Sequence, residues 1–139
     1  MPIIDVYAAA DTLPPGTEWA LAQQLTALVM RAEGFGDSPP EAIKAITGCY
    51  LHWLPADAVH TAASDRARTV RVQVTTAAGG LNQDGRDMVV AQITNIIAAT
   101  GGDPSLVERT WVIITEAVEG GWGINGVAFG RHNSAGAFT

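Results

Sequence analysis

Residues 70–75 read Val-Arg-Val-Gln-Val-Thr and open the stretch that decides the fold. Three valines alternate with polar side chains, which is the period-two pattern of a strand with two unlike faces. A shift of 68 positions then aligns residues 2–47 with residues 70–115 without a gap. The residues that recur include Val6 and Val74, Ala9 and Ala77, Gln24 and Gln92, and Gly34 and Gly102. The chain therefore contains two copies of one supersecondary unit.

Each copy predicts a strand, an amphipathic helix and a second strand. Leu21, Leu25 and Leu28 fall on one helical stripe, as do Val89 and Ile93 in the second copy. Thr17 and Asp84 are the expected helix caps, and Gly34 and Gly101-Gly102 are the expected helix ends. The expected elements are strands at 2–7 and 70–75, helices at 17–33 and 84–100, and strands at 42–53 and 110–117.

The resulting fold class is α/β, in one domain spanning residues 1–139. Two tandem right-handed βαβ units, at 2–54 and 69–122, are joined by residues 55–68 and form a four-stranded sheet with both helices on one face. The other face would be bare, so we expect the chain to cover it by oligomerisation. The Gly-rich tail from Gly120 onward is expected to form a turn or small hairpin that reaches a neighbour.

Composition excludes several classes of partner. The net charge is -6 without a basic run, so nucleic acid and anionic membranes are poor partners. Hydrophobic residues make up 47% and charged residues 16%, which disfavours disorder. The lone Cys49 fits a reducing compartment, and neither a signal peptide nor a membrane span is evident. The expected location is the cytoplasm.

Two segments carry a specific resemblance. Residues 112–116 read Val-Ile-Ile-Thr-Glu, and residues 121–126 read Gly-Trp-Gly-Ile-Asn-Gly. Together with the Met-Pro start, they resemble 4-oxalocrotonate tautomerases of the tautomerase superfamily. The two-copy length is similar to its fused branch, which includes cis-3-chloroacrylic acid dehalogenase and malonate semialdehyde decarboxylase.

The resemblance implies that Pro2 is the working residue once Met1 is removed. The prolyl secondary amine would act as general base or acid, since an α-amino group titrates near ~7.7–8 and burial lowers that pKa. Trp122 would line the pocket beside it, although a tryptophan at this place can equally be a core or interface residue.

The departures from the family are also informative. Trp111 stands where 4-oxalocrotonate tautomerase has a substrate-binding arginine; it is kept as a candidate substrate-binding residue that can donate one N–H bond but supplies no charge. No residue of the dehalogenase site except the proline is matched. Arg71, Arg131 and Asn125 are the remaining candidates to bind the substrate's anion, although for each arginine a solvated or interface charge is favoured over a functional role. His52, His60 and His132 lack metal-ligand spacing, so we expect no metal.

The resemblance thus predicts a cofactor-free tautomerase or isomerase of a small α-keto or 2-hydroxy-dienoate compound, assembled as a trimer with three Pro2 sites. Two alternatives remain open. One is a proline-dependent decarboxylase, hydratase or dehalogenase of the same superfamily, and the other is a non-catalytic binding or assembly protein with this fold.

Overall fold

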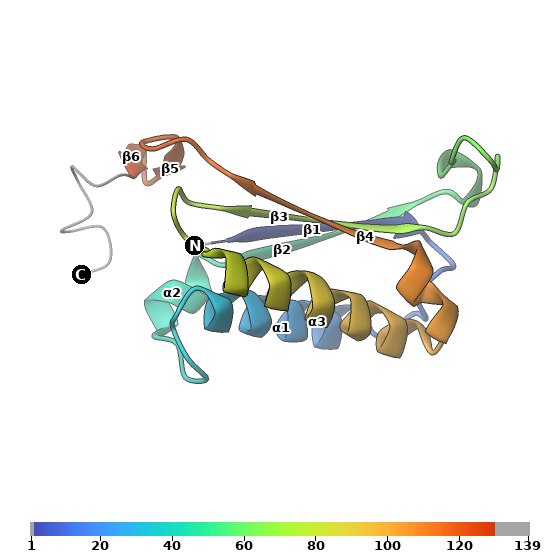
Figure 1. Ribbon diagram of the computed structural model, residues 1–139, viewed down its shortest axis with the longest axis horizontal. Helices are drawn as coiled ribbons and strands as arrows, with labels where there is room; N and C mark the ends of the chain where they lie inside the picture. Colours follow the sequence, from blue (N-terminus) through green and yellow to red (C-terminus); the bar gives the residue numbers. More distant parts are fainter. Residues whose placement is uncertain (1, 130–139) are drawn as a thin grey trace.

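A computed structural model describes residues 2–129 of the chain. Four strands form one sheet in the order β2-β1-β3-β4, and two long helices cover one of its faces (Figure 1). The strands are β1 (Ile3–Ala9), β2 (Gly48–Leu54), β3 (Val70–Thr76) and β4 (Thr110–Glu116), and the long helices are α1 (Glu18–Ala32) and α3 (Gln83–Gly101).

The sheet is built from two βαβ units. β1 pairs with β2 in parallel and β3 pairs with β4 in parallel, each pair being connected through one long helix. The units meet where β1 runs antiparallel to β3, with Val6 opposite Val72. The predicted fold class is confirmed, whereas the boundaries of the copies at 2–54 and 69–122 stay a prediction.

The core lies between the sheet and the two helices. Alternate residues of the central strands are fully buried, which is the result that the period-two pattern predicts. They pack against the apolar stripes of α1 and α3, so burial of these side chains stabilises the two-layer arrangement. The fully buried members include Ile4, Val6, Leu21, Leu25, Val72, Val74, Val89, Ile93 and Ile97.

Two predicted element boundaries were wrong, and a third was right in position but lacks the predicted capping bond. The strand expected at 42–53 begins only at Gly48, because the short helix α2 (Glu41–Ala45) follows Pro39-Pro40. The cap of α3 is Asn82, whose side chain accepts the Gly85 N–H at 2.8 Å, and not Asp84. Thr17 does occupy the N-cap position of α1, but its hydroxyl donates to the Pro14 carbonyl instead of accepting from the helix.

The chain after β4 forms the small hairpin that the glycines predict. Its strands are β5 (Trp122–Ile124) and β6 (Val127–Phe129). Asn125 and Gly126 connect them and both have positive φ, as a two-residue hairpin turn requires. Whether the hairpin reaches a neighbour stays a prediction.

Short 3-10 helices mark the remaining connections. One is η1 (Ala56–Ala58) in the joint between the copies, and the other is η2 (Pro104–Arg109) before β4. The joint lies at the end of the sheet opposite the amino terminus (Figure 1). Among the described residues, no helix is long and apolar enough to cross a membrane.

Candidate active site at the Pro2 end of the sheet

Pro2 is buried immediately before β1. Its carbonyl accepts the Gly48 N–H at 3.1 Å, which ties the start of β1 to β2. Ile3 lies opposite Thr75 in the antiparallel pair, so Pro2 comes opposite Thr76, one step beyond the last paired residues. The ends of β3 and β4 therefore border the Pro2 site.

Thr76 is the residue of β3 that lies beside Pro2 on the helix-covered face. It is fully buried, and its carbonyl accepts the Ala117 N–H at 2.9 Å. Its hydroxyl oxygen has no hydrogen-bond partner in the described part of the chain. Gly80 lies over it, since a Cβ at that position would stand 3.7 Å from Thr76 Oγ1.

Arg86 and Glu116 lie next to Thr76. Glu116 is the register partner of Thr76 in β4, and its Oε1 lies 3.6 Å from Arg86 Nη1. Glu116 Oε2 accepts the Gly79 N–H at 3.4 Å, while Arg86 donates to the Leu81 carbonyl at 2.8 Å. A guanidinium and a loop N–H thus converge on one carboxylate near Pro2, which is an arrangement able to bind an anion.

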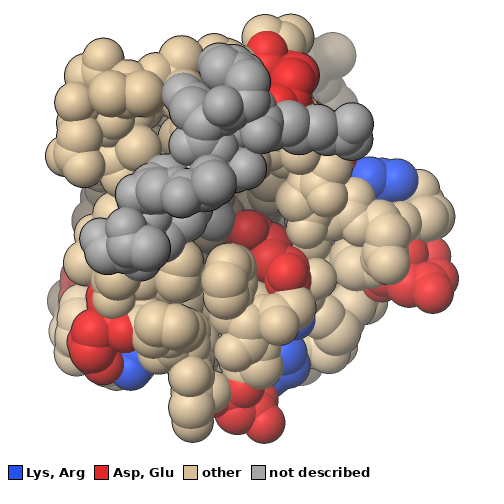
Figure 2. All heavy atoms as spheres, turned by 90° about the vertical axis from the view of Figure 1, so that its left-hand side faces the viewer, with Lys and Arg blue, Asp and Glu red and all other residues tan. Residues whose placement is uncertain are grey.

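Glu33 borders the same end from the helix layer. It is the C-cap of α1, where Ala32 packs close to Gly85 of α3, and one of its carboxyl oxygens is shielded from solvent. Burial raises the pKa of the Glu33 carboxyl above its ordinary value, and the positive charge at the amino terminus partly offsets this increase. Seen from this end, acidic and basic side chains are interspersed among uncharged ones (Figure 2).

Two of the predicted substrate-binding residues lie together, but away from Pro2. Arg71 and Trp111 are register partners on the sheet face that the helices leave open. With Tyr7 and His60 they line a shallow cavity of about 220 Å³ beside the joint. Arg71 is four residues from Thr75 along β3, about 13 Å at ~3.3 Å per residue, so within one chain it lies far from Pro2.

The other predicted residues lie in or beyond the hairpin. Trp122 is half-buried at the start of β5, and Asn125 is exposed in the turn, where its positive φ gives it a structural role. Arg131 lies outside the described residues. The hairpin follows the end of β4, which is the Pro2 end of the sheet, so Trp122 is closer to the site along the fold than Trp111 is.

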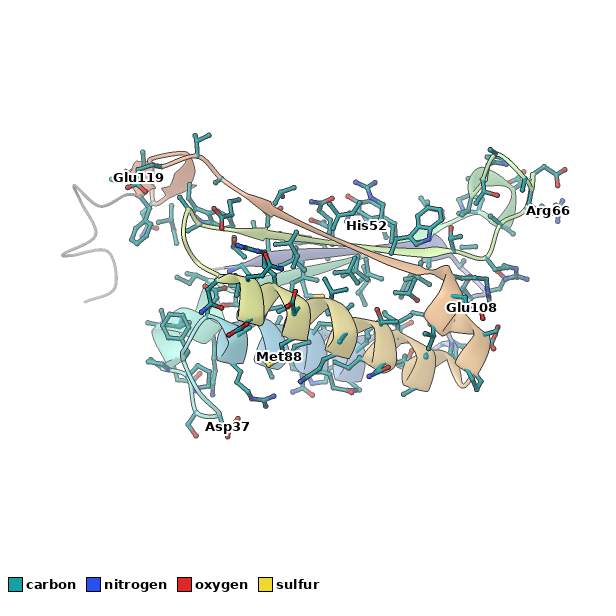
Figure 3. The ribbon with its side chains drawn as sticks, viewed as in Figure 1. Asp37, His52, Arg66, Met88, Glu108 and Glu119 are labelled. Carbon is teal, nitrogen blue, oxygen red and sulfur yellow. The ribbon has the colours of Figure 1, made fainter. Side chains whose placement is uncertain are left out.

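The open face carries a polar cluster that sequence reasoning missed. His52 Nε2 lies 2.7 Å from Asp5 Oδ1, the His52 and Tyr7 rings stack at 4.3 Å, and Arg71 lies 5.1 Å from the Tyr7 ring centre. Figure 3 shows His52 on the side of the sheet away from the helices. The strand alternation places these residues on one face, but the register that joins them was not readable from the sequence.

The ionisable side chains of the described residues are not grouped as metal ligands. Within residues 2–129, no group of three or more His, Cys, Asp or Glu side chains is positioned to bind a metal ion. At the Pro2 end of the sheet the described residues thus bring together Pro2, Thr76, Glu116 and Arg86, with Glu33 at the adjoining end of the helix layer.

Comparisons with known proteins identify the fold. No family model matches the chain, and no curated protein matches it by sequence. Among solved structures, it is similar to Pt0534 inactivated by 2-oxo-3-pentynoate, with a TM-score of 0.77 and 17% identity over 94% of this chain and 98% of that one.

Two further solved structures agree. A fused 4-OT wild-type symmetric trimer gives a TM-score of 0.73 and 18% identity over 90% of this chain and 93% of that chain. A member of the cis-3-chloroacrylic acid dehalogenase family gives a TM-score of 0.72 and 19% identity over 92% of this chain and 84% of that chain. The chain therefore has the tautomerase-superfamily fold that its motifs predicted, and at these identities the likeness shows the fold alone.

Proposed function

We propose that this protein is a cofactor-free keto–enol tautomerase or double-bond isomerase of a small α-keto or 2-hydroxy-dienoate compound. The observation that carries the proposal is the position of Pro2, which is buried at the start of β1 in a tautomerase fold. Removal of Met1 would convert its amide nitrogen into a secondary amine. We further propose a cytoplasmic location, for which the lone Cys49 is the support.

The chemistry follows from the environment of that amine. A free α-amino group titrates near ~7.7–8, and burial disfavours its charged form. A neutral Pro2 amine would take a proton from the enol or the α-carbon and return it elsewhere on the conjugated system. The proline ring fixes the nitrogen relative to β1, so the amine is held in place between the two proton transfers.

The negative charge that develops on the substrate needs hydrogen-bond donors or a cation. Arg86 and the Gly79 N–H are donors at the Pro2 end of the sheet, and both lie against Glu116. We infer that a substrate carboxylate competes with Glu116 for these donors. Arg71 and Trp111 could contribute to substrate binding at a Pro2 site only from a neighbouring subunit. Trp122 and Asn125 would contribute through the position of the β5–β6 hairpin.

One observation favours a second reaction class, in which protonated Pro2 acts as the acid of a decarboxylase or hydratase. In the chain that retains Met1, burial raises the pKa of the Glu33 carboxyl and the positive charge of the amino terminus lowers it in part, and removal of Met1 would place the new terminus at Pro2. A carboxylate in that position would stabilise the ammonium form and raise the pKa of the amine. The pH dependence of the rate separates the two classes, because a base is active above its pKa and an acid below it.

The decisive experiment replaces Pro2. Pro2→Ala should retain the fold and lose about 10²–10⁴-fold in rate with phenylpyruvate as the probe, the range for one positioned acid–base group. Intact mass of the purified protein should show that Met1 is absent, and Pro15→Ala, in an exposed loop, is the control. Full activity in Pro2→Ala would contradict the role of Pro2, whereas a processed wild type without activity on any such substrate would leave a non-catalytic protein with a tautomerase fold.

A further inference from the structure

The buried hydroxyl of Thr76 has no hydrogen-bond partner in the described residues, and the proposed reaction does not use it. Buried hydroxyl groups in native proteins are nearly always hydrogen-bonded, and an unpaired one destabilises the fold. Thr76 is fully enclosed, and no donor or acceptor in residues 2–129 reaches its Oγ1. A valine would fill the same space without that cost, so the hydroxyl group calls for a partner.

The sheet register identifies the neighbour of this hydroxyl. Pro2 and Thr76 are opposite each other, and both side chains lie on the helix-covered face. The Pro2 carbonyl bonds to β2 and the Thr76 carbonyl bonds to the chain after β4. The two residues are thus a non-hydrogen-bonded antiparallel pair, the kind whose Cα atoms approach to about 4.5 Å.

The chemistry of Pro2 changes when Met1 is hydrolysed from it. With Met1 attached, the Pro2 nitrogen is a tertiary amide, which carries no hydrogen and is not a base. After removal it is a secondary amine, which donates and accepts when neutral and donates when charged. A threonine hydroxyl can donate or accept by rotation, so it matches both states of the amine.

We propose that the Thr76 hydroxyl is the hydrogen-bond partner of the Pro2 amine, and that this partner exists only after Met1 is removed. The inference rests on the proposed function, because both require that Met1 is removed. Thr76 is a positioning residue: it fixes the nitrogen in the buried site while a proton arrives or leaves. The ionisable groups around the pair are Glu33 from α1, Arg86 from α3 and Glu116 from β4.

Thermal unfolding of two forms of the protein tests the proposal without any substrate. The processed form is compared with a form that retains Met1, made with methionine aminopeptidase inhibited and verified by intact mass. Thr76→Val should lower the unfolding midpoint of the processed form by about 4 °C, since it removes one hydrogen bond. In the form that retains Met1 it should leave the midpoint unchanged or raise it.

Two variants serve as controls at the same protein concentration. Thr12 carries another buried hydroxyl without a partner in the described residues, and it follows β1 at the opposite end from Pro2. Thr12→Val should therefore affect both forms alike. Thr76→Ser keeps the hydroxyl and should also affect both forms alike. An equal effect of Thr76→Val on both forms would overturn the proposal.

A spectroscopic readout addresses the contact directly. With ¹⁵N-labelled proline, the amine resonance of processed protein should shift in Thr76→Val and stay in place in Thr12→Val. An unshifted resonance would also overturn the contact. If Pro2→Ala remains active while both readouts are as expected, the proposed role of Pro2 in the reaction is wrong and the proposed Thr76–Pro2 contact is supported. If Pro2→Ala is inactive and the readouts are absent, only the contact fails.

Discussion

At the scale of single residues, Cys49 shows how the fold changes a side chain's reactivity. Cys49 faces the helices from β2, opposite Ile4, and burial together with the Asp5 carboxylate raises the pKa of its thiol from 9.0 to about 11. The thiolate is the reactive form, so iodoacetamide at pH 8 should modify Cys49 about 100-fold more slowly than an unperturbed thiol. Unfolding in urea should restore the ordinary rate.

The contribution of Asp5 to that rate can be separated from burial. Asp5→Asn removes the second cause and leaves the larger one, so it should accelerate alkylation only partly. Mass spectrometry of quenched samples measures both rates. Alkylation of the folded wild type at the rate of the urea-unfolded chain would contradict the burial of Cys49.

The same scale shows what the sequence could reveal about the site. Pro2 could be proposed from the sequence because the proposed chemistry needs a proline directly after Met1, and this role stays a prediction. Thr76, Arg86 and Glu33 could not, because each acquires its place through the register of β1 with β3 or through the ends of α1 and α3. Arg71 looked suitable because it mirrors the Pro2 strand, but antiparallel pairing puts it at the other end of the sheet.

At the scale of elements, the start of α3 distinguishes two candidate caps. Asn82 accepts the Gly85 N–H at 2.8 Å, whereas Asp84 lies already inside the first turn. Asn82→Ala should therefore reduce the free energy of unfolding by about 1 kcal/mol, the usual effect of losing a cap. Asp84→Ala should change it by less, since a charge near the helix start contributes about 0.3–1 kcal/mol.

Urea titrations of both variants, at one protein concentration, measure the difference. Equal losses in the two would mean that the side-chain cap does not stabilise α3. The cap was mispredicted because Asn82 and Asp84 are both of a residue type that caps helices, and only the extended backbone of Asn82 in the structure chooses between them.

The strands and long helices were predictable because their periods differ and the second copy repeats the first. The helix α2 was not, because residues 41–45 give barely one turn of pattern and the second copy has a 3-10 helix, η2, before its strand. Short helices depend on their flanking prolines and on packing more than on periodicity. The internal repeat therefore predicted the elements that both copies share, and it could not predict α2 and η2, in which the copies differ.

At the scale of the whole molecule, the open sheet face is the surface that a monomer would expose to solvent. The helices cover only one face (Figure 1), and the exposed large side chains of the other face include Tyr50, Trp111 and Ile113. The same face carries the polar cluster of Asp5, His52, Tyr7 and Arg71, which is held by one hydrogen bond and two ring contacts. Such a face can pack against other copies at its apolar margin while its polar centre stays hydrogen-bonded.

We therefore expect a trimer that uses this face. Trp111 is 48% and Ile113 41% exposed on β4, an edge strand of the sheet, and Val107 and Val90 have the same exposed fractions in η2 and α3. Trp111→Glu/Ile113→Glu should convert the trimer to monomers, because two carboxylates per copy would be desolvated in the interface. The matched Val107→Glu/Val90→Glu pair adds the same charge outside the open face and should leave the trimer intact.

Light scattering and circular dichroism at micromolar concentration check both pairs. The wild type and the Val107/Val90 pair should have about three times the mass of one chain, and the Trp111/Ile113 pair should have the mass of one chain with unchanged helix signal. A monomeric wild type would contradict the trimer outright. Dissociation by the Val107/Val90 pair alone would move the interface from the open face to the helix layer, and Arg71 would then have no route to the Pro2 site of a neighbour.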